Sequence, residues 1–293
     1  MSADKIAILN KKSVWQHILP DFNITDTPLE IPAAYQLSQE KIDDLKTAFK
    51  EEGVIQIDAI IPKEQTQKLE HGIRTLRQKG IHQVFAFVYD EYWIALKQLM
   101  PVLKQMFGED IMVMPDIWAW MVERGAKHSG WPIHRDLANL QLAKDGSPNM
   151  ITLWIPLVDV DPYNSCMYVV PANLDTNYPD NLSSYSFKPE NCRALPAPAG
   201  SAILWSANIL HWGSRSTRYA KTERISYAFY LQREGTPLNG PVIPLDQAFT
   251  FETRLRYIAT QIMDYSRDPF APFIHDWAKS IRFDPKESDP SMY

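Results

Sequence analysis

Hydrophobic positions follow a helical spacing near both ends of the chain. In SQEKIDDLKTAFKEE (38–52), apolar residues recur three and four positions apart, as they do on one face of an amphipathic helix. Ser38 is a suitable N-cap for this helix, and Gly53 is a suitable stop. The same kind of spacing predicts three further helices, at about 62–79 (opened by Pro62), 91–107 and 246–265.

The middle of the chain has the pattern of strands instead. VIQIDAII (54–61) alternates between apolar and polar positions, and from about residue 111 short runs of branched and aromatic residues are separated by Pro, Gly, Asn and Asp. These runs are IMVMPDIWAWMVER, MITLWIPLVDV, CMYVVPA, SAILWSANILHWG and ERISYAFYLQR. Strands at this spacing predict a sandwich or barrel. A jelly roll is one such fold, and its double sheet limits the exposure of edge strands.

We therefore expect a mainly β protein with flanking helices, built around a jelly-roll core. No repeat, low-complexity segment or charge block marks a linker, so we expect a single domain over 1–293. Within it we expect three regions: 1–110 with helices and a strand, 111–235 as the jelly roll, and 236–293 with the C-terminal helices and tail.

The composition limits the kinds of molecule that the protein is expected to bind. Hydrophobic residues make up 45% of the chain and charged residues 22%, as in an ordinary soluble globular protein. The formal charge of −5 argues against a protein that holds nucleic acid by bulk electrostatics. No apolar run has the length needed to span a membrane. We expect a cytoplasmic protein that acts on a small molecule; the sequence does not predict its oligomeric state.

Candidate chemistry begins with the stretch SGWPIHRDLANLQ. His134 and Asp136 stand two positions apart, so at a strand end both side chains can reach one metal ion. An isolated H-x-D is common by chance, and a metal site needs a further ligand from a distant strand. His211 meets this need, because it follows the apolar run AILWSANIL. Two histidines and one carboxylate form the facial triad of non-haem Fe(II) oxygenases, with open positions left for a co-substrate and O₂.

An anchor for the co-substrate follows His211 in the chain. Arg224 and Ser226 alternate in the segment RIS, so they share one strand face. A guanidinium group binds a carboxylate through two parallel hydrogen bonds, and the far carboxylate of 2-oxoglutarate fits that role. The alternative is an ordinary ion pair between Arg224 and an acid such as Glu223.

With these residues in place, the chain resembles the phytanoyl-CoA dioxygenase-like (PhyH) branch of the Fe(II)/2-oxoglutarate oxygenases. The resemblance covers roughly 38–233 and rests on the opening helix, strand and helix, on HRD, on MITLWIPLVDVDPYNSCMYVVPAN, on APAGSAILWSANILHWGS and on RIS. It implies a double-stranded β-helix that uses Fe(II), 2-oxoglutarate and O₂ to hydroxylate a C–H bond, with succinate and CO₂ as co-products. The chain departs from the family at Ser165, often glycine, and at Ala172-Asn173, often Ser-His.

The resemblance also favours hydroxylation over halogenation. Related halogenases carry a small residue in place of the carboxylate, and this chain retains Asp136. Desaturation, epimerisation or ring formation at the same centre stays open, because the sequence does not place the substrate carbon. A jelly roll that binds a metal or ligand without turnover is the alternative from another class.

Two residues of ITLWIPL are candidate neighbours of the co-substrate. Thr152 and Trp154 share a face opposite to Ile151, Leu153 and Ile155. If that face lines the barrel mouth, Trp154 packs against 2-oxoglutarate and Thr152 adds a hydrogen bond.

Candidate substrate contacts are less specific. Trp118 and Trp120 in DIWAWMV either border the substrate cavity or belong to the core. His128, Trp131 and Asn139 flank the segment that carries the first two ligands, and loops near a site often hold substrate.

Overall fold

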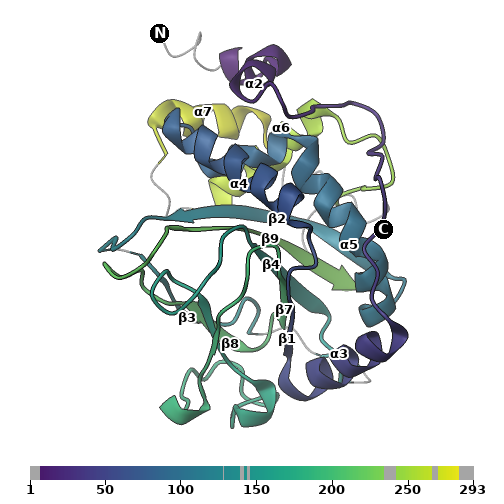
Figure 1. Ribbon diagram of the computed structural model, residues 1–293, viewed down its shortest axis with the longest axis vertical. Coiled ribbons are helices and arrows are strands. Elements are labelled where there is room, and N and C mark those ends of the chain that lie inside the picture. The colour runs from purple at the N-terminus through teal and green to yellow at the C-terminus, as the bar shows by residue number, and fades with distance from the viewer. Residues whose placement is uncertain are drawn as a thin grey trace.

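Two antiparallel sheets and a layer of helices make up the protein (Figure 1). The computed structural model describes residues 7–127, 129–138, 142–143, 146–233, 242–265 and 270–283. The α-helices within these ranges are α2 (Lys12–Ile18), α3 (Gln39–Glu52), α4 (Lys63–Gln78), α5 (Asp90–Phe107), α6 (Phe251–Asp264) and α7 (Pro272–Ile281). Short 3-10 helices lie at η1 (Gln83–Val88), η2 (Ala172–Leu174) and η3 (Pro189–Asn191).

The strands form the two layers of a jelly roll, as predicted. The larger sheet has the order β1-β7-β4-β9-β2 and the smaller sheet the order β3-β8-β5-β6, with every pairing antiparallel. Their bounds are β1 (Val54–Ile57), β2 (Ile111–Val122), β3 (Trp131–His134), β4 (Met150–Pro156), β5 (Met167–Val170), β6 (Arg193–Leu195), β7 (Ala202–Ser206), β8 (Leu210–Gly213) and β9 (Arg224–Arg233).

The outer face of the larger sheet is covered by helices, and its inner face turns toward the smaller sheet (Figure 1). Phe229 of β9 points outward, where its ring centroid lies 5.5 Å from both Phe87 and Trp93 of the helical layer. Its neighbours Ala228 and Tyr230 point the other way and line a cavity between the sheets. Because strand side chains alternate, the aromatic layer under the helices leaves the opposite face available for a site.

The helix predicted at 38–52 is confirmed with its caps. The Ser38 hydroxyl accepts a hydrogen bond from the Lys41 amide at 3.2 Å, and Gly53 adopts a left-handed conformation with φ 70°. Gly53 also needs its small size, since an added Cβ would lie 2.7 Å from Ile209.

Two strand predictions were too long. The strand predicted at 54–61 ends at Ile57, because Ala59 has a positive φ of 45° and donates its amide to the Ser201 hydroxyl. The run SAILWSANILHWG is interrupted at 207–209, where the Asn208 amide bonds the Ser206 hydroxyl and its side chain bonds the Leu137 carbonyl. The two halves of this run therefore lie in different sheets, β7 and β8, an outcome that hydrophobicity alone does not encode.

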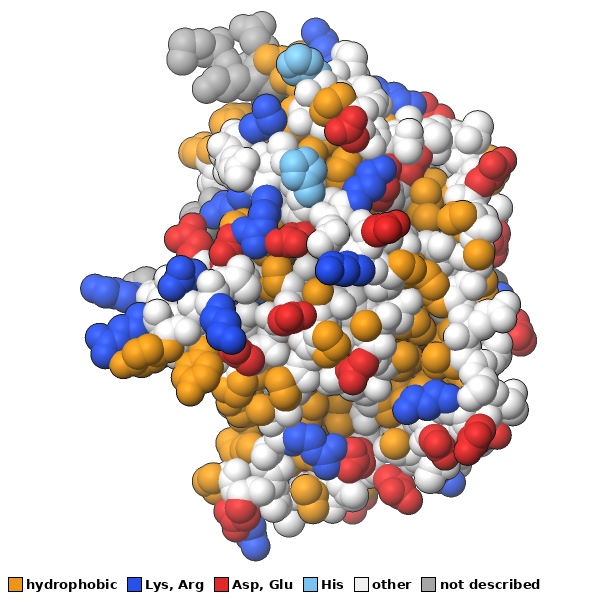
Figure 2. Space-filling view, in the orientation of Figure 1, with side chains coloured by type: hydrophobic (Ala, Val, Ile, Leu, Met, Phe, Trp, Pro, Cys, Tyr) orange, Lys and Arg blue, Asp and Glu red, His pale blue; other side chains and the backbone are white. Residues whose placement is uncertain are grey.

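The charged surface in Figure 2 shows no field of a single sign. On that face, Lys and Arg side chains are interspersed with Asp and Glu. Among the described residues, no helix has both the length and the apolar character required to cross a bilayer.

A buried ion pair joins the N-terminal segment, α5 and α6. Arg254 of α6 is 0% exposed and donates to the Asp90 carboxylate, to the Val88 carbonyl at 2.9 Å and to the Thr25 carbonyl at 3.3 Å. Asp90 in turn accepts the Thr25 amide at 3.1 Å. These bonds satisfy charges that would otherwise be costly to bury.

We expect Arg254→Ala to lower the free energy of unfolding by about 3–5 kcal/mol, because it leaves the Asp90 carboxylate buried without its cation. Urea-induced unfolding measures the change. Glu252→Ala, at an exposed position of the same helix, is the matched control and should cost less than about 1 kcal/mol. An Arg254→Ala variant as stable as this control would contradict the prediction.

Candidate active site

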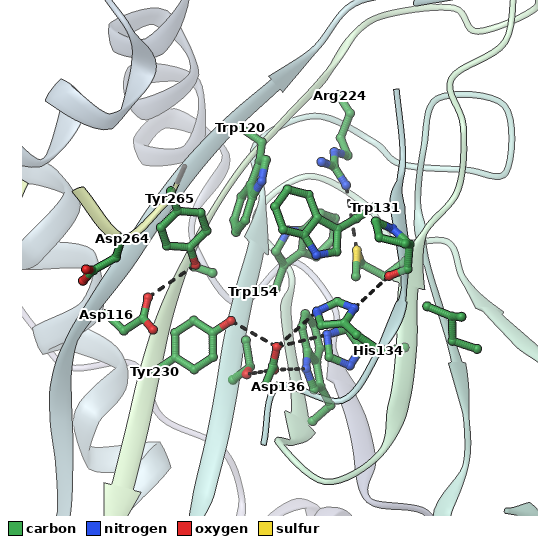
Figure 3. A pocket seen from close by; sticks show the side chains of 17 residues that line it. Asp116, Trp120, Trp131, His134, Asp136, Trp154, Arg224, Tyr230, Asp264 and Tyr265 are labelled. Atoms are coloured by element: carbon green, nitrogen blue, oxygen red, sulfur yellow. Dashed lines mark hydrogen bonds and ion pairs between the residues drawn. The ribbon is translucent and has the colours of Figure 1, made fainter. Parts of the chain in front are cut away.

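The candidate metal ligands converge between the sheets (Figure 3). His134 ends β3 and pairs with His211 of β8 across the ladder, which places the two imidazoles side by side with ring centroids 4.2 Å apart. Asp136 follows two residues after His134, and its Oδ1 lies 3.4 Å from the Nε2 atom of each histidine. One ligand atom from each residue falls within 4.8 Å of the other two, so a single ion fits among them.

Backbone carbonyls set the tautomers of both histidines. Nδ1 of His134 lies 2.9 Å from the Pro132 carbonyl oxygen, and Nδ1 of His211 lies 3.2 Å from that of Ile209. A carbonyl oxygen only accepts, so each Nδ1 carries the proton and donates. Each Nε2 is thereby the ring atom turned toward Asp136, and its lone pair can bind a metal when the ring is neutral.

The Asp136 carboxylate is held by one row of side chains across three strands. Thr152 of β4 pairs with Trp205 of β7 on one side and with Tyr230 of β9 on the other. Thr152 and Trp205 donate to Asp136 Oδ2 at 2.7 and 3.1 Å, and the Tyr230 hydroxyl donates to Oδ1 at 3.2 Å. The bonds to Oδ2 leave Oδ1 directed at the imidazoles.

Charge and burial act in opposite directions on this carboxylate. Burial raises the pKa of Asp136, but the neighbouring His211 and His134 rings lower this pKa by more than burial raises it. The net pKa therefore lies well below the usual value. Asp136 is therefore an ionised, buried ligand at neutral pH.

The residue between the ligands fixes their loop. Arg135 is 4% exposed and points away from the ligand cluster, where it pairs with Asp175 at 2.7 Å. It also donates to the Asn208 carbonyl at 2.6 Å and to the Leu182 carbonyl at 3.0 Å. The middle residue of HRD thus ties the ligand loop to the turn before β8. We did not predict this role from the sequence, because Asp175 is distant in the chain.

Arg224 lies in the same cavity and forms no ion pair with an acid among the described residues. Its side chain is 5% exposed, donates to the Ser165 carbonyl at 3.1 Å, and has an Nε without a hydrogen-bond partner in the described part of the chain. Its guanidinium carbon lies 5.7 Å from the Trp154 ring. The alternative pairing with Glu223 does not occur, since Glu223 binds Arg74. Ser226 is buried on the same strand face, does not itself line the cavity, and has a hydroxyl without a partner among the described residues.

The cavity has a volume of about 500 Å³, within the range of small-molecule sites. Thr152 and Trp154 both line it, as the alternation of β4 predicted, although the Thr152 hydroxyl is engaged by Asp136. Trp120 and Trp131 also line it. Trp118 does not; it is buried behind the cavity wall, with its ring stacked 4.1 Å from Tyr265. The candidates His128 and Asn139 lie outside the described residues.

Several residues of the cavity wall were not predicted from the sequence, including Trp205 and Tyr230, which donate to Asp136. Three others come from β2 and from the end of α6. Asp116 of β2, Asp264 at the end of α6 and Tyr265 directly after it all line the cavity. Burial and the nearby charges of Asp136 and Asp264 raise the pKa of Asp116 to about 7. Asp116 alternates with Trp118 and Trp120, which is the signal that places it on this face. The α6 residues carry no comparable signal.

The match to a known protein family agrees with this geometry. The model of the phytanoyl-CoA dioxygenase (PhyH) family matches residues 34–220, more than half of the chain. The chain belongs to the phytanoyl-CoA dioxygenase family. This confirms the resemblance that the motifs indicated, and it makes the protein an enzyme of the PhyH-like Fe/2-oxoglutarate-dependent oxygenases. Among curated proteins, no sequence matches the chain.

Several solved structures share the fold of this PhyH family member at low sequence identity. The non-heme monooxygenase ThoJ aligns with a TM-score of 0.56 and 12% identity, covering 81% of this chain and 100% of ThoJ. SnoK, a non-heme alpha ketoglutarate dependent carbocyclase from nogalamycin biosynthesis, aligns with a TM-score of 0.52 and 15% identity over 70% and 87% of the chains. HygX from Streptomyces hygroscopicus, solved with nickel and 2-oxoglutarate bound, aligns with a TM-score of 0.51 and 12% identity over 68% and 88%.

We expect Thr152→Val to weaken divalent metal binding by about 10–100-fold, because Asp136 Oδ2 loses its shortest hydrogen bond and the carboxylate is no longer fixed. Calorimetric titration with Ni²⁺ measures the affinity. Thr47→Val, at an exposed position on α3, is the control for the substitution itself. Equal affinity in the wild type and Thr152→Val would show that the row of donors does not orient the ligand.

Proposed function

We propose that this PhyH family member is an Fe(II)/2-oxoglutarate-dependent dioxygenase that hydroxylates an unactivated C–H bond of a small metabolite. The observation that carries the proposal is one cavity that holds His134, Asp136 and His211 together with the buried Arg224, which has no acidic partner within the described residues. A metal triad and a carboxylate receiver are the two parts that this chemistry requires of the protein.

The donor set fits Fe(II). Two neutral imidazoles and one ionised carboxylate from the cluster would hold the ion and leave three positions of an octahedron open. A structural zinc site would instead use four protein ligands. When bound, Fe(II) with 2-oxoglutarate and O₂ supplies the oxidising power that replaces a C–H hydrogen by hydroxyl and releases succinate and CO₂.

Arg224 and Ser226 would receive the outer carboxylate of 2-oxoglutarate. The pKa of Arg224 is lowered by burial to about 10, so the guanidinium is still charged at neutral pH. Its Nε and the Ser226 hydroxyl are buried polar groups without partners, and a carboxylate satisfies both. The small Ala228 lies between Ser226 and Tyr230 on the same face and leaves room beside Trp154.

A small-molecule substrate suits this cavity. Its volume of about 500 Å³ has to accommodate 2-oxoglutarate as well as the substrate, and the four tryptophans of its wall, Trp120, Trp131, Trp154 and Trp205, would limit the access of water to the reacting groups. We propose no nucleic-acid or membrane partner.

The proposal predicts a chelate that spectroscopy detects. Anaerobic addition of Fe(II) and then 2-oxoglutarate to the apo protein should produce the weak visible charge-transfer band of the metal–keto-acid chelate. His211→Ala should abolish the band. Arg224→Ala should require at least about tenfold more 2-oxoglutarate to reach it, because the outer carboxylate loses its charged partner.

Arg215→Ala is the matched control for the loss of a cation. Arg215 is exposed, so its removal should leave the 2-oxoglutarate requirement unchanged. If the wild type gave no band and bound Fe(II) no better than His211→Ala, the cluster would not be a metal centre. The jelly roll would then be a binding module without this chemistry.

Product analysis tests the type of reaction. With a substrate found by screening for succinate release, hydroxylation predicts a product that gains one oxygen atom, and that atom should derive from ¹⁸O₂. A product that has lost two hydrogens, or that has only inverted a stereocentre, would assign desaturation or epimerisation to the same centre.

A further inference from the structure

The two ends of the cavity carry opposite charge. Arg224 lies at one end, whereas Asp116 and Asp264 lie at the other; in Figure 3, Trp120 and Trp154 lie between the two ends and Asp136 lies below them. The arginine end accounts for the outer carboxylate of 2-oxoglutarate under the proposed function. The acidic end is not used by the metal or by the co-substrate, so it is available to the substrate.

Asp116 has an incomplete set of partners. The Tyr265 hydroxyl donates to its Oδ1 at 3.4 Å, and among the described residues no Lys, Arg or His forms an ion pair with it. Asp136 and Asp264 both act on it as like charges, and with burial they favour its neutral form. A positive group in this part of the cavity would offset the same repulsion.

Aromatic rings complete this end of the cavity. Tyr265 is held rigidly, because its ring lies 4.1 Å from that of Trp118 with an interplanar angle of 9°. Trp120 lines the cavity beside it, as Figure 3 shows. A carboxylate beside an indole and a phenol is a favourable environment for an ammonium group, which is attracted by negative charge and by aromatic ring faces.

A separate feature shows that this cavity is built to receive ligands. Arg224 is 5% exposed, donates to the Ser165 carbonyl, and has an Nε without a partner among the described residues, so an anion in the cavity would add the compensation that its charge lacks. The Arg224 end and the Asp116 end open into one space of about 500 Å³. The electrostatic field of the protein would thus direct an anionic ligand to the Arg224 end and a cationic ligand to the Asp116 end.

We propose that Asp116, with Tyr265 and Trp120, forms a substrate subsite that binds a protonated amine. The subsite rests on the proposed function, since it orients the substrate relative to the metal cluster. Asp264 at the exposed end of the same wall adds attraction for a cation as it enters. An anionic substrate would be repelled from this end, and a neutral alcohol would gain only hydrogen bonds.

Three probes that share one ring and one chain length test the charge requirement. Tryptamine is the cation, tryptophol the neutral alcohol and indole-3-acetate the anion. Calorimetry on the full-length protein loaded with Ni²⁺ and 2-oxoglutarate, which prevents turnover, measures their binding. We expect tryptamine to bind at least about tenfold more tightly than tryptophol, and indole-3-acetate to bind most weakly.

The Asp116→Asn variant tests whether Asp116 causes the preference for the cationic probe. It should remove the preference for tryptamine over tryptophol, whereas Asp246→Asn, with a side chain 88% exposed and remote from the cavity lining, should retain it. If Asp116→Asn does not fold, Tyr265→Phe tests the same wall, and should reduce the preference severalfold because Asp116 loses its hydroxyl donor.

Equal binding of the three probes, no binding of tryptamine at millimolar concentration, or a preference that survives in Asp116→Asn would overturn the proposal. Its failure is distinguishable from failure of the proposed function. The charge-transfer band of the wild-type protein with Fe(II) and 2-oxoglutarate needs no amine. A band without amine preference would retain the oxygenase and reject only the subsite.

Discussion

The hydrogen bonds on the Asp136 carboxylate are the interaction on which the rest of the site depends. Thr152, Trp205 and Tyr230 form one row across β7, β4 and β9, and all three donate to that carboxylate. The loop that carries Asp136 is therefore attached to the larger sheet, whereas the histidines belong to the smaller one. A single carboxylate joins the two layers at the point where a metal would bind.

This arrangement requires charge to be buried, and each buried charge is compensated differently. Asp136 is stabilised by donors and by the imidazoles, and Arg135 by a complete set of acceptors around Asp175. Arg224 differs from both, since it forms no ion pair with an acid among the described residues and its Nε has no hydrogen-bond partner there. Leaving such a group unpaired costs free energy that a ligand recovers on binding.

The sequence was informative wherever chemistry coincided with a strand pattern. HRD, His211 and the alternation of Arg224 with Ser226 were readable because residue type and face agree. Local spacing also predicted α3 with its Ser38 cap. Nothing local in the sequence distinguished Trp118 from Trp120, because both lie on the same strand face. Only the stacking of Trp118 on Tyr265 places Trp118 in the core, whereas Trp120 lines the cavity. The contribution of α6 residues to the wall depends on how a distant helix packs on β2.

These observations separate the part of the site that sets the chemistry from the part that sets its outcome. The structures that share this fold include a monooxygenase and a carbocyclase, so the fold alone does not determine the product. The metal cluster and Arg224 lie on β3, β8 and β9, within the jelly roll. Asp116, Tyr265 and Asp264 lie on β2 and the end of α6, at its margin. Under the proposed function, a substrate fixed by this margin would present one C–H bond to the metal, so the distance between the wall and the metal cluster would decide which carbon reacts.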